Sequence, residues 1–259
     1  MKLKNYEFKS DPYQHQLDTL KSSAHRNLFA LFLEMGLGKS KILLDNAGML
    51  FEEGKISGLL IVSPKGNLNN WDSNEISRHL PERIKRNVLV WQPNHTQRWT
   101  KAFKDMVQDD STGVLNIFLV NVEAFATVKA CTHVEEFLVT HDAMMAIDES
   151  TTIKNPKAKR TKHLIKLGPL ADYRRILTGF PITKAPLDLY SQCYFLSPNL
   201  LGFSSFYAFQ ARYAITQSRQ MGRHAFQQVM GFQKLDELQE SIKDFSIRRR
   251  KEECLDLPP

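Results

Sequence analysis

The chain has 259 residues, of which 42% are hydrophobic, so it is long enough to bury a substantial core. Its 35 basic and 28 acidic residues give a net charge of +7, which favours polyanionic partners without requiring one. Three widely spaced cysteines and the lack of any apolar run near 18 residues argue against a disulfide framework, a zinc site and a membrane span.

Along residues 1–200, short apolar runs alternate with longer stretches of helical periodicity. The segment 39–54, KSKILLDNAGMLFEEG, has apolar positions at helical spacing and closes on a glycine. The alternation predicts an α/β fold with a largely parallel sheet covered by helices on both faces, and ligands then bind at the carboxyl ends of the strands. Six runs are predicted to be buried strands: 27–33, 58–63, 88–91, 116–121, 143–148 and 174–178.

After about residue 200 the strands give way to polar sequence with helical character. We expect residues 1–200 to form the main lobe and residues 201–259 to form an appended helical subregion with a linker. The three tryptophans lie at positions whose periodicity predicts core packing rather than stacking on nucleic-acid bases: Trp71, Trp91 and Trp99.

The stretch LEMGLGKS, residues 33–40, stands between the first predicted strand and the helix that follows it. Its glycines allow backbone N–H groups to close around phosphate oxygens, because no β-carbon blocks their approach. In such a loop Lys39 neutralises the β- and γ-phosphates and the Ser40 hydroxyl ligates a magnesium ion. Leu33 stands where the usual pattern has a glycine, so an ordinary glycine-rich turn remains the alternative for this motif taken alone.

The stretch AMMAIDES, residues 143–150, is an apolar strand that ends in two adjacent carboxylates, Asp148 and Glu149. Two neighbouring acids repel each other unless a cation lies above them. In a phosphate-loop enzyme the first acid holds magnesium through its water shell, and the second orients or deprotonates the attacking water. Alone, the pair is also compatible with a solvated turn. Together the two motifs favour ATP hydrolysis.

Further motifs follow in a fixed order along nearly the whole chain: DPYQHQL, LEMGLGKS, LLIVSPKGNLNNWDSNE, LVNVEAF, IDESTTIKNPKAKRTK, RRILTGFPITKAPLDLYSQCYFLSPNLLG and FSIRRRKEECLDLPP. In this order they resemble the first RecA-like lobe of a Swi/Snf-type DNA translocase, within helicase superfamily two. The segment FSSFYAFQARYA is similar to the annealing-helicase branch of that family.

The resemblance implies a RecA-like P-loop NTPase fold that uses ATP and Mg²⁺. It assigns catalysis to Lys39, Asp148 and Glu149, the metal to Ser40 and Asp148, and coupling between hydrolysis and movement to Thr178 and Gly179. The implied nucleotide-binding residues are Gln14, which would read the adenine, Met35, Gly36, Leu37, Gly38, Lys39, Ser40 and Lys41.

The same resemblance implies binding of double-stranded or branched DNA through its phosphate backbone, with no membrane partner. The matching positions are Lys65, Asn67, Asn121, Lys154, Asn155 and Lys157. The first residues carry no apolar core of a secretory signal, so we expect a protein that is not secreted. Its expected location is cytoplasmic if it is bacterial or phage-encoded, and nuclear if it is eukaryotic.

Two positions depart from the family pattern. Thr151 stands where the family usually has histidine, and Phe180 replaces the second threonine of its motif. The family also has a second RecA-like lobe in cis, which supplies an arginine worth roughly 10³ to 10⁵ in rate. We therefore expect the present lobe alone to hydrolyse ATP poorly. A self-sufficient phosphate-loop kinase for a small molecule and a catalytically silent nucleic-acid-binding module remain alternative hypotheses.

Overall fold

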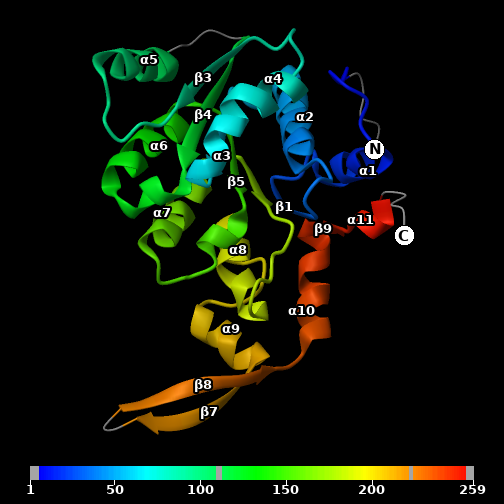
Figure 1. Cartoon of the computed structure of the whole chain (residues 1–259), viewed down its shortest axis with the longest axis vertical. Coiled ribbons are helices and arrows are strands. Elements are labelled where there is room, and N and C mark those ends of the chain that lie inside the picture. Colours follow the sequence, from blue (N-terminus) through cyan, green and yellow to red (C-terminus); the bar gives the residue numbers. More distant parts are fainter. Residues whose placement is uncertain (1–5, 109–112, 222–223, 255–259) are drawn as a thin grey trace.

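The central feature of the computed structural model is one sheet of seven parallel strands in the order β3, β4, β2, β5, β6, β1, β9 (Figure 1). The structure describes residues 6–108, 113–221 and 224–254. All six predicted strands are confirmed, and a seventh, β9, joins the edge beside β1. The strands are β1 Leu28–Leu33, β2 Gly58–Ser63, β3 Arg86–Val90, β4 Leu115–Asn121, β5 Ala143–Asp148, β6 Tyr173–Leu177 and β9 Ser246–Arg249.

The central strands are apolar in continuous runs because both of their faces are covered. In β2 the side chains of Leu59 and Ile61 enter one core, and those of Leu60 and Val62 enter the other. This alternation along a strand gives two hydrophobic cores separated by the sheet. The prediction of helices on both faces is confirmed.

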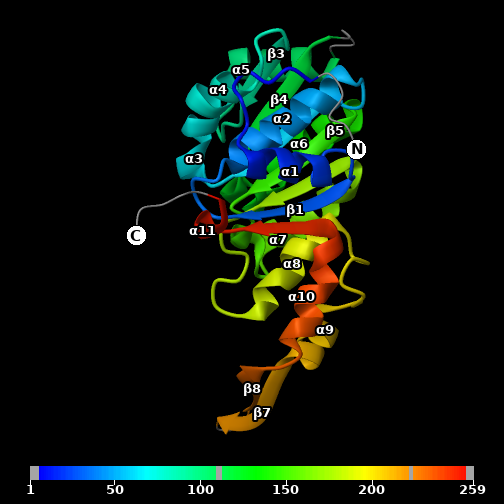
Figure 2. The same cartoon turned by 90° about the vertical axis from the view of Figure 1, so that its right-hand side faces the viewer.

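One face carries helices from the first third of the chain, and the other carries helices from the middle (Figures 1 and 2). The first set is α1 Gln14–Ser23, α2 Lys39–Glu52, α3 Lys65–Asn70 and α4 Ile76–His79, and a π-helical turn, Trp71–Glu75, joins the last two. The second set is α5 Gln97–Gln108, α6 Val128–Thr140, α7 Lys159–Leu167 and α8 Leu189–Leu196. Trp71, Trp91 and Trp99 are buried, which confirms their predicted place in the core.

The prediction of a helical region after residue 200 is wrong for residues 214–221 and 224–232. There β7 Ala214–Met221 and β8 His224–Phe232 form an antiparallel hairpin that projects from the body (Figures 1 and 2). The helical prediction was based on polarity, which a hairpin with both faces exposed shares with a surface helix. Short helices flank the hairpin: α9 Phe206–Tyr213, α10 Leu235–Ile242 and, after β9, α11 Lys251–Cys254.

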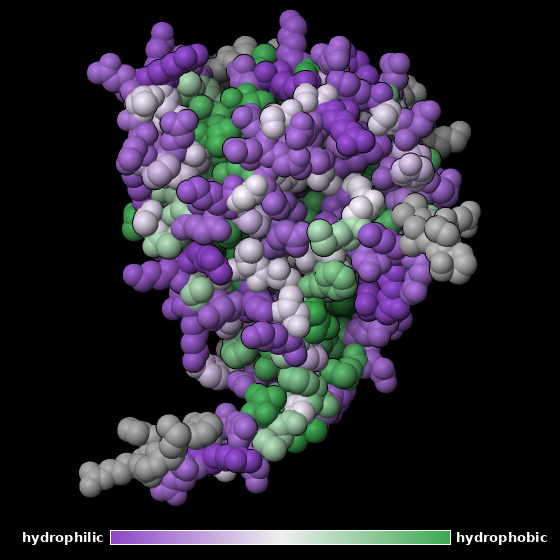
Figure 3. Space-filling view, viewed as in Figure 1, coloured by the Kyte–Doolittle hydropathy of each residue, from purple (hydrophilic) through white to green (hydrophobic). Residues whose placement is uncertain are grey.

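An apolar groove lies below the β9 edge, between α10 and the loop that follows β6. Ile182, Leu238 and Ile242 line it, and Figure 3 shows apolar residues gathered over α10 and the base of the hairpin. Phe180, in the same loop, is 57% exposed. Within the described ranges no helix combines the length and the apolar character that a bilayer crossing requires.

A buried arginine ties the sheet to the helices of the first face. The side chain of Arg175 is fully buried, and Asn46 Oδ1 accepts hydrogen bonds from its Nε (3.2 Å) and Nη2 (3.1 Å). The carbonyls of Ser23 and Asn27 accept two more. No carboxylate takes part in these contacts, so neutral oxygens from α1, α2 and the loop before β1 compensate the buried charge.

We expect Asn46→Ala to lower the free energy of unfolding by about 2 to 4 kcal/mol, because two donors of a buried guanidinium lose their acceptor. Urea unfolding followed by circular dichroism measures the effect. Gln227→Ala, in the exposed hairpin, serves as the control and should change stability by less than about 0.5 kcal/mol. Equal stability of the two variants would contradict the proposed role of this network.

Candidate functional site

Apart from Gln14, which begins α1, the predicted site residues lie along one edge of the seven-stranded sheet, since all of its strands are parallel. From β4 to β9 this carboxyl edge carries in turn Asn121, Lys65, the Asp148–Glu149 pair, Thr178, the phosphate loop 34–38 and the segment after β9. The acids therefore stand in the middle, between Asn121 and Lys65 on one side and the phosphate loop on the other.

Two glycines of the phosphate loop adopt conformations that other residues rarely take. Gly36 has φ +87° and Gly38 has φ +79°. A β-carbon on Gly38 would lie 2.2 Å from the side-chain nitrogen of Gln16, so a larger residue there would push this side-chain amide away from the loop. The loop places the start of α2 at Lys39, where the free backbone N–H groups of a helix N-terminus attract anions.

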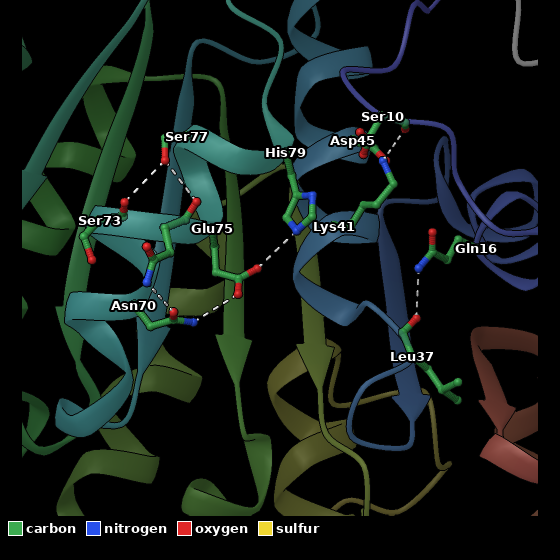
Figure 4. Close-up of polar contacts among 11 residues, drawn as sticks. Ser10, Gln16, Leu37, Lys41, Asp45, Asn70, Ser73, Glu75, Ser77 and His79 are labelled. Carbon is green, nitrogen blue, oxygen red and sulfur yellow. Dashed lines mark hydrogen bonds and ion pairs between the residues drawn. The ribbon is translucent and has the colours of Figure 1, made fainter. Parts of the chain in front are cut away.

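Helix α1 holds the phosphate loop through the carbonyl oxygen of Leu37. Gln16 Nε2 donates to this oxygen at 3.3 Å (Figure 4). His15 Nε2 lies 3.0 Å from the same oxygen. The side chain of Gln14, the predicted adenine reader, instead donates to Asp18 on the exposed side of α1. Gln16 was missed in the sequence, although it lies in the same motif. The role assigned to Gln14 stays a prediction.

Lys39 begins α2 and its Nζ donates to the carbonyl oxygen of Leu33 at 3.1 Å, so the side chain folds back across the loop. Its positive charge also acts on Glu149, where it opposes the rise in pKa that burial and Asp148 cause. The structure thus brings together the lysine and the acid that the sequence paired across more than one hundred residues.

The carboxylate of Asp148 is fixed by three hydrogen bonds. Ser63 Oγ (2.9 Å) and Trp71 Nε1 (3.0 Å) donate to Oδ2, and the backbone N–H of Glu149 donates to Oδ1 (3.0 Å). The residue is 8% exposed. Trp71 therefore has a second role besides core packing, which helical periodicity alone does not reveal: it orients the predicted metal-binding acid.

Glu149 stands in a strained backbone conformation, with φ 48° and ψ 59° in the left-handed region. Burial and the neighbouring Asp148 raise the pKa of its carboxyl, while Lys39 and a hydrogen bond from Thr178 oppose the rise. Thr178 Oγ1 donates to Oε2 at 3.3 Å, so the predicted coupling residue touches the predicted catalytic acid. A raised pKa suits a group that accepts a proton near neutral pH.

The donors at this edge fit a magnesium ion that is shared with a nucleotide. Asp148 contributes carboxylate oxygens and Ser40 a hydroxyl, and Mg²⁺ prefers few protein oxygens together with phosphates and water. Ser40 also lies near Glu75 and helps to lower the pKa of that carboxyl, after the larger effects of His79 and Asn70. Over the described residues, no cluster of three or more His, Cys, Asp or Glu forms a closed metal site.

A cavity opens beside the phosphate loop, between α1, α2 and α4. Gly36, Gly38, Lys39, Ser40 and Lys41 line it, whereas Met35 is 64% exposed and Leu37 is buried. Its remaining wall comes from residues that the sequence did not single out for this role, namely Ser10, Asp11, Tyr13, Gln16, Glu75, Arg78 and His79. This set has the mixture of aromatic, amide and charged groups that a nucleotide contacts.

Lys41, a predicted nucleotide-binding residue, is engaged within the chain (Figure 4). Its Nζ donates to the carbonyl oxygen of Ser10 (2.9 Å) and lies 3.0 Å from Asp45 Oδ2. Asp45 is fully buried, and burial raises its pKa to about 6 against the opposing effects of Lys41 and His79. His79 in turn contacts Glu75 at 3.5 Å. A chain of charged groups thus lines the back of the cavity.

The loops after β5 and β6 are joined by Gln192 of α8. Its Oε1 accepts from Ser150 Oγ (2.7 Å), and its Nε2 donates to the carbonyl oxygen of Pro181 (2.8 Å). Lys154 reaches the same second loop, where it hydrogen-bonds to Thr183 and lies 3.4 Å from Asp188. These contacts connect the two loops that the sequence associated with hydrolysis and coupling, and Gln192 carried no sequence signal for this role.

The predicted DNA-binding residues fall into two groups. Lys65 and Asn121 line a groove at the ends of β2 and β4, which Lys129 of α6 also lines, and Asn67 is exposed beside it. In the second group Asn155 and Lys157 are exposed, whereas Lys154 is held by the ion pair with Asp188. The remaining predicted contacts stay available to a ligand at the carboxyl edge. Lys157 also lies over the ring of Tyr207.

Comparisons with known proteins agree in both sequence and fold. A model of the SNF2-related domain matches residues 15–259. The DNA annealing helicase and endonuclease ZRANB3 of Bos taurus is 30% identical over 227 residues, which are 87% of this chain and 19% of that protein. TATA-binding protein-associated factor 172 of Homo sapiens is 40% identical over 116 residues, which are 44% of this chain and 6% of that protein.

Among solved structures, the Sulfolobus solfataricus SWI2/SNF2 ATPase core domain matches with a TM-score of 0.70 and 26% identity. The match covers 100% of this chain and 48% of that one. The present chain therefore spans about half of the solved core and about one fifth of the length of ZRANB3.

The buried Asp45 predicts a pH dependence of stability. Its pKa is about 6 in the folded chain and about 4 when unfolded, so between these values the folded state binds more protons. This group therefore makes the free energy of unfolding fall as the pH rises from 4 to 6, and its full penalty is present above pH 6. Asp45→Asn does not titrate. The free energy of unfolding of Asp45→Asn, measured relative to that of wild type, should therefore increase by about 2 to 3 kcal/mol between pH 4 and pH 7.

Urea titrations at four pH values measure this difference. Asp105→Asn, which changes an exposed carboxylate of α5, is the matched control and should show no such trend. A pH-independent difference between Asp45→Asn and wild type would show that Asp45 ionises as readily inside the fold as outside it.

Proposed function

Because this chain belongs to the SNF2-related domain family of Swi/Snf-type helicase-like ATPases, we propose that it is the first motor lobe of an ATP-dependent translocase on double-stranded DNA. The observation that carries the proposal is the convergence of Lys39, Asp148, Glu149 and Thr178 at adjacent strand ends. These residues come from three segments that are separate in the sequence, and a turn or a solvated acid pair would not require them to meet.

In this proposal the cavity beside the phosphate loop holds ATP, with the phosphates at the loop and at the start of α2. Lys39 neutralises phosphate charge, and Ser40 and Asp148 hold Mg²⁺, which supplies charge compensation for the phosphates when it is bound. Glu149 accepts a proton from the attacking water. Its contact with Thr178 then transmits the state of the site to the loop after β6.

Two variants separate binding from chemistry. Lys39→Ala should weaken ATP–Mg²⁺ binding at least tenfold, since it removes a charge from the phosphates. Glu149→Gln should keep binding within about threefold but slow single-turnover hydrolysis by roughly 10² or more, since the amide accepts no proton. Calorimetry and phosphate release measure the two effects. Lys85→Ala, at the opposite edge of the sheet, is the control. If Lys39→Ala binds ATP as tightly as this control, the nucleotide site is misassigned.

We propose that DNA lies along the other half of the carboxyl edge, over Lys65, Asn67 and Asn121 and over the loop that carries Lys157. The support is positional: these side chains follow strands β2, β4 and β5, and Lys65 and Lys157 are exposed. ZRANB3, which is similar over most of this chain, bears a name that describes action on DNA. Contacts of this kind with phosphates carry no sequence preference.

The double variant Lys65→Ala, Lys157→Ala should bind a mixed-sequence DNA duplex more weakly. The slope of log affinity against log salt should also decrease in magnitude by about 1 to 2. The reason is that binding releases fewer counterions from the DNA when phosphate contacts are lost. Fluorescence anisotropy at several salt concentrations measures both quantities, with Lys85→Ala as the matched control. DNA binding that does not depend on salt would rule out the backbone contacts.

The proposal includes a second RecA-like lobe in cis, with residues 1–200 as the ATP-binding part and residues 201–259 as extension and linker. The chain aligns with 48% of the solved SWI2/SNF2 core, which leaves the other half of that core unmatched. The exposed Phe180 and the apolar groove under β9 offer a surface for such a lobe. We propose that this lobe supplies an arginine that stabilises the charge of the transition state, and that DNA stimulates hydrolysis only when both lobes are present.

A further inference from the structure

The strand β9 ends directly beside the phosphate loop, and Glu34 fastens the two together. The backbone N–H of Glu34 donates to the carbonyl oxygen of Arg249 (3.1 Å), and the carboxylate of Glu34 accepts from the backbone N–H of Lys251 (2.6 Å). In the sheet Leu33 stands opposite Arg249. The backbone of Lys251 is therefore held at the loop by the carboxylate of Glu34, independently of the position of its own side chain.

The side chain of Lys251 lies over Gly36. Its Cε is 3.5 Å and its Nζ is 3.8 Å from the position that a β-carbon on Gly36 would occupy. Because Gly36 has no side chain, the lysine reaches the rim of the loop without obstruction. An ammonium group this close to a phosphate-binding turn adds positive potential where the backbone N–H groups already attract anions.

Neighbouring charges leave this ammonium free for a ligand. Arg250, the adjacent cation, pairs with Glu252 at 3.1 Å, and Glu253 caps the start of α11 through the backbone N–H of Arg250. Glu34 is occupied by the backbone of Lys251. Over the described part of the chain, no carboxylate lies within ion-pair distance of Lys251 Nζ.

We propose that Lys251 binds the terminal phosphate of a nucleoside triphosphate held in the phosphate loop; this inference rests on the proposed function of that loop. Lys39 approaches the loop from α2, and its charge acts on Glu149 at the hydrolytic end of the site. Lys251 approaches from β9, on the side of β1 away from β6. The two ammonium groups flank the loop. A terminal phosphate between them would contact both Lys39, which begins α2, and Lys251, which follows the edge strand β9.

The consequence is a distinction between the triphosphate and the diphosphate. Loss of the terminal phosphate removes the anion that Lys251 contacts, and the segment after β9 loses one of its attachments to the loop. The segment keeps its backbone contacts with Glu34, so the effect is a change in affinity rather than unfolding. Lys251 thereby becomes a residue that senses which nucleotide is bound.

The test compares two nucleotides on one set of variants. Lys251→Met keeps the aliphatic stem over Gly36 and removes the charge, Lys251→Arg keeps the charge, and Arg250→Ala is the control on the neighbouring cation. Calorimetry measures the binding of a non-hydrolysable ATP analogue and of ADP, each with Mg²⁺. We expect Lys251→Met to bind the analogue about tenfold more weakly and ADP within twofold of wild type, while the other two variants stay within threefold for both nucleotides.

Equal changes for the two nucleotides, or no change for either, would overturn the assignment of Lys251 to the terminal phosphate. Thermal melting of Lys251→Met checks that the fold is intact. If the variant melts normally but binds both nucleotides equally weakly, the substitution has altered the structure of the loop rather than removed a contact with the terminal phosphate. If wild type binds neither nucleotide, the proposed function fails and the inference falls with it. If wild type binds both and only Lys39→Ala loses them, the function stands and the inference fails.

Discussion

The structure depends on the parallel arrangement of its seven strands. Parallel strands end at the same edge, so the residues that follow β1, β2, β4, β5, β6 and β9 are brought into one row although they are distributed over more than two hundred positions. The order of the strands within the sheet, which differs from their order in the sequence, decides which residues become neighbours. Glu149 meets Thr178 because β5 lies next to β6, and the phosphate loop meets Lys251 because β1 lies next to β9.

The carboxyl edge is held rigid by side chains that do no chemistry in our proposal. Ser63 and Trp71 orient Asp148, Gln192 ties the loop after β5 to the loop after β6, and His15 with Gln16 holds Leu37 of the phosphate loop. Buried polar groups of this kind are stable only when their hydrogen bonds are satisfied together. A site that must place a metal, a phosphate and a water within tenths of an ångström needs this supporting layer.

Charge is distributed along the same edge in a way that separates two ligands. Lys39 and Lys251 serve the phosphate loop, and the exposed Lys65 and Lys157 lie near the ends of β2 and β5. Between them stand Asp148 and Glu149, whose negative charge keeps a polyanion off the centre of the edge unless a cation intervenes. In our proposal this arrangement gives the nucleotide and the nucleic acid neighbouring but distinct places.

The sequence alone determined the six apolar strands, the glycine-rich turn and the acid pair, because continuous apolar runs and glycine–lysine–serine spacing are local signals. It could not determine the hairpin at residues 214–232, since exposed polar strands and exposed polar helices have similar composition. Nor could it show that Gln16 rather than Gln14 reaches the phosphate loop, that Asp188 holds Lys154, or that Lys251 lies over Gly36. Those contacts join residues up to 215 positions apart, and only the packing of strands and helices decides which side chains meet.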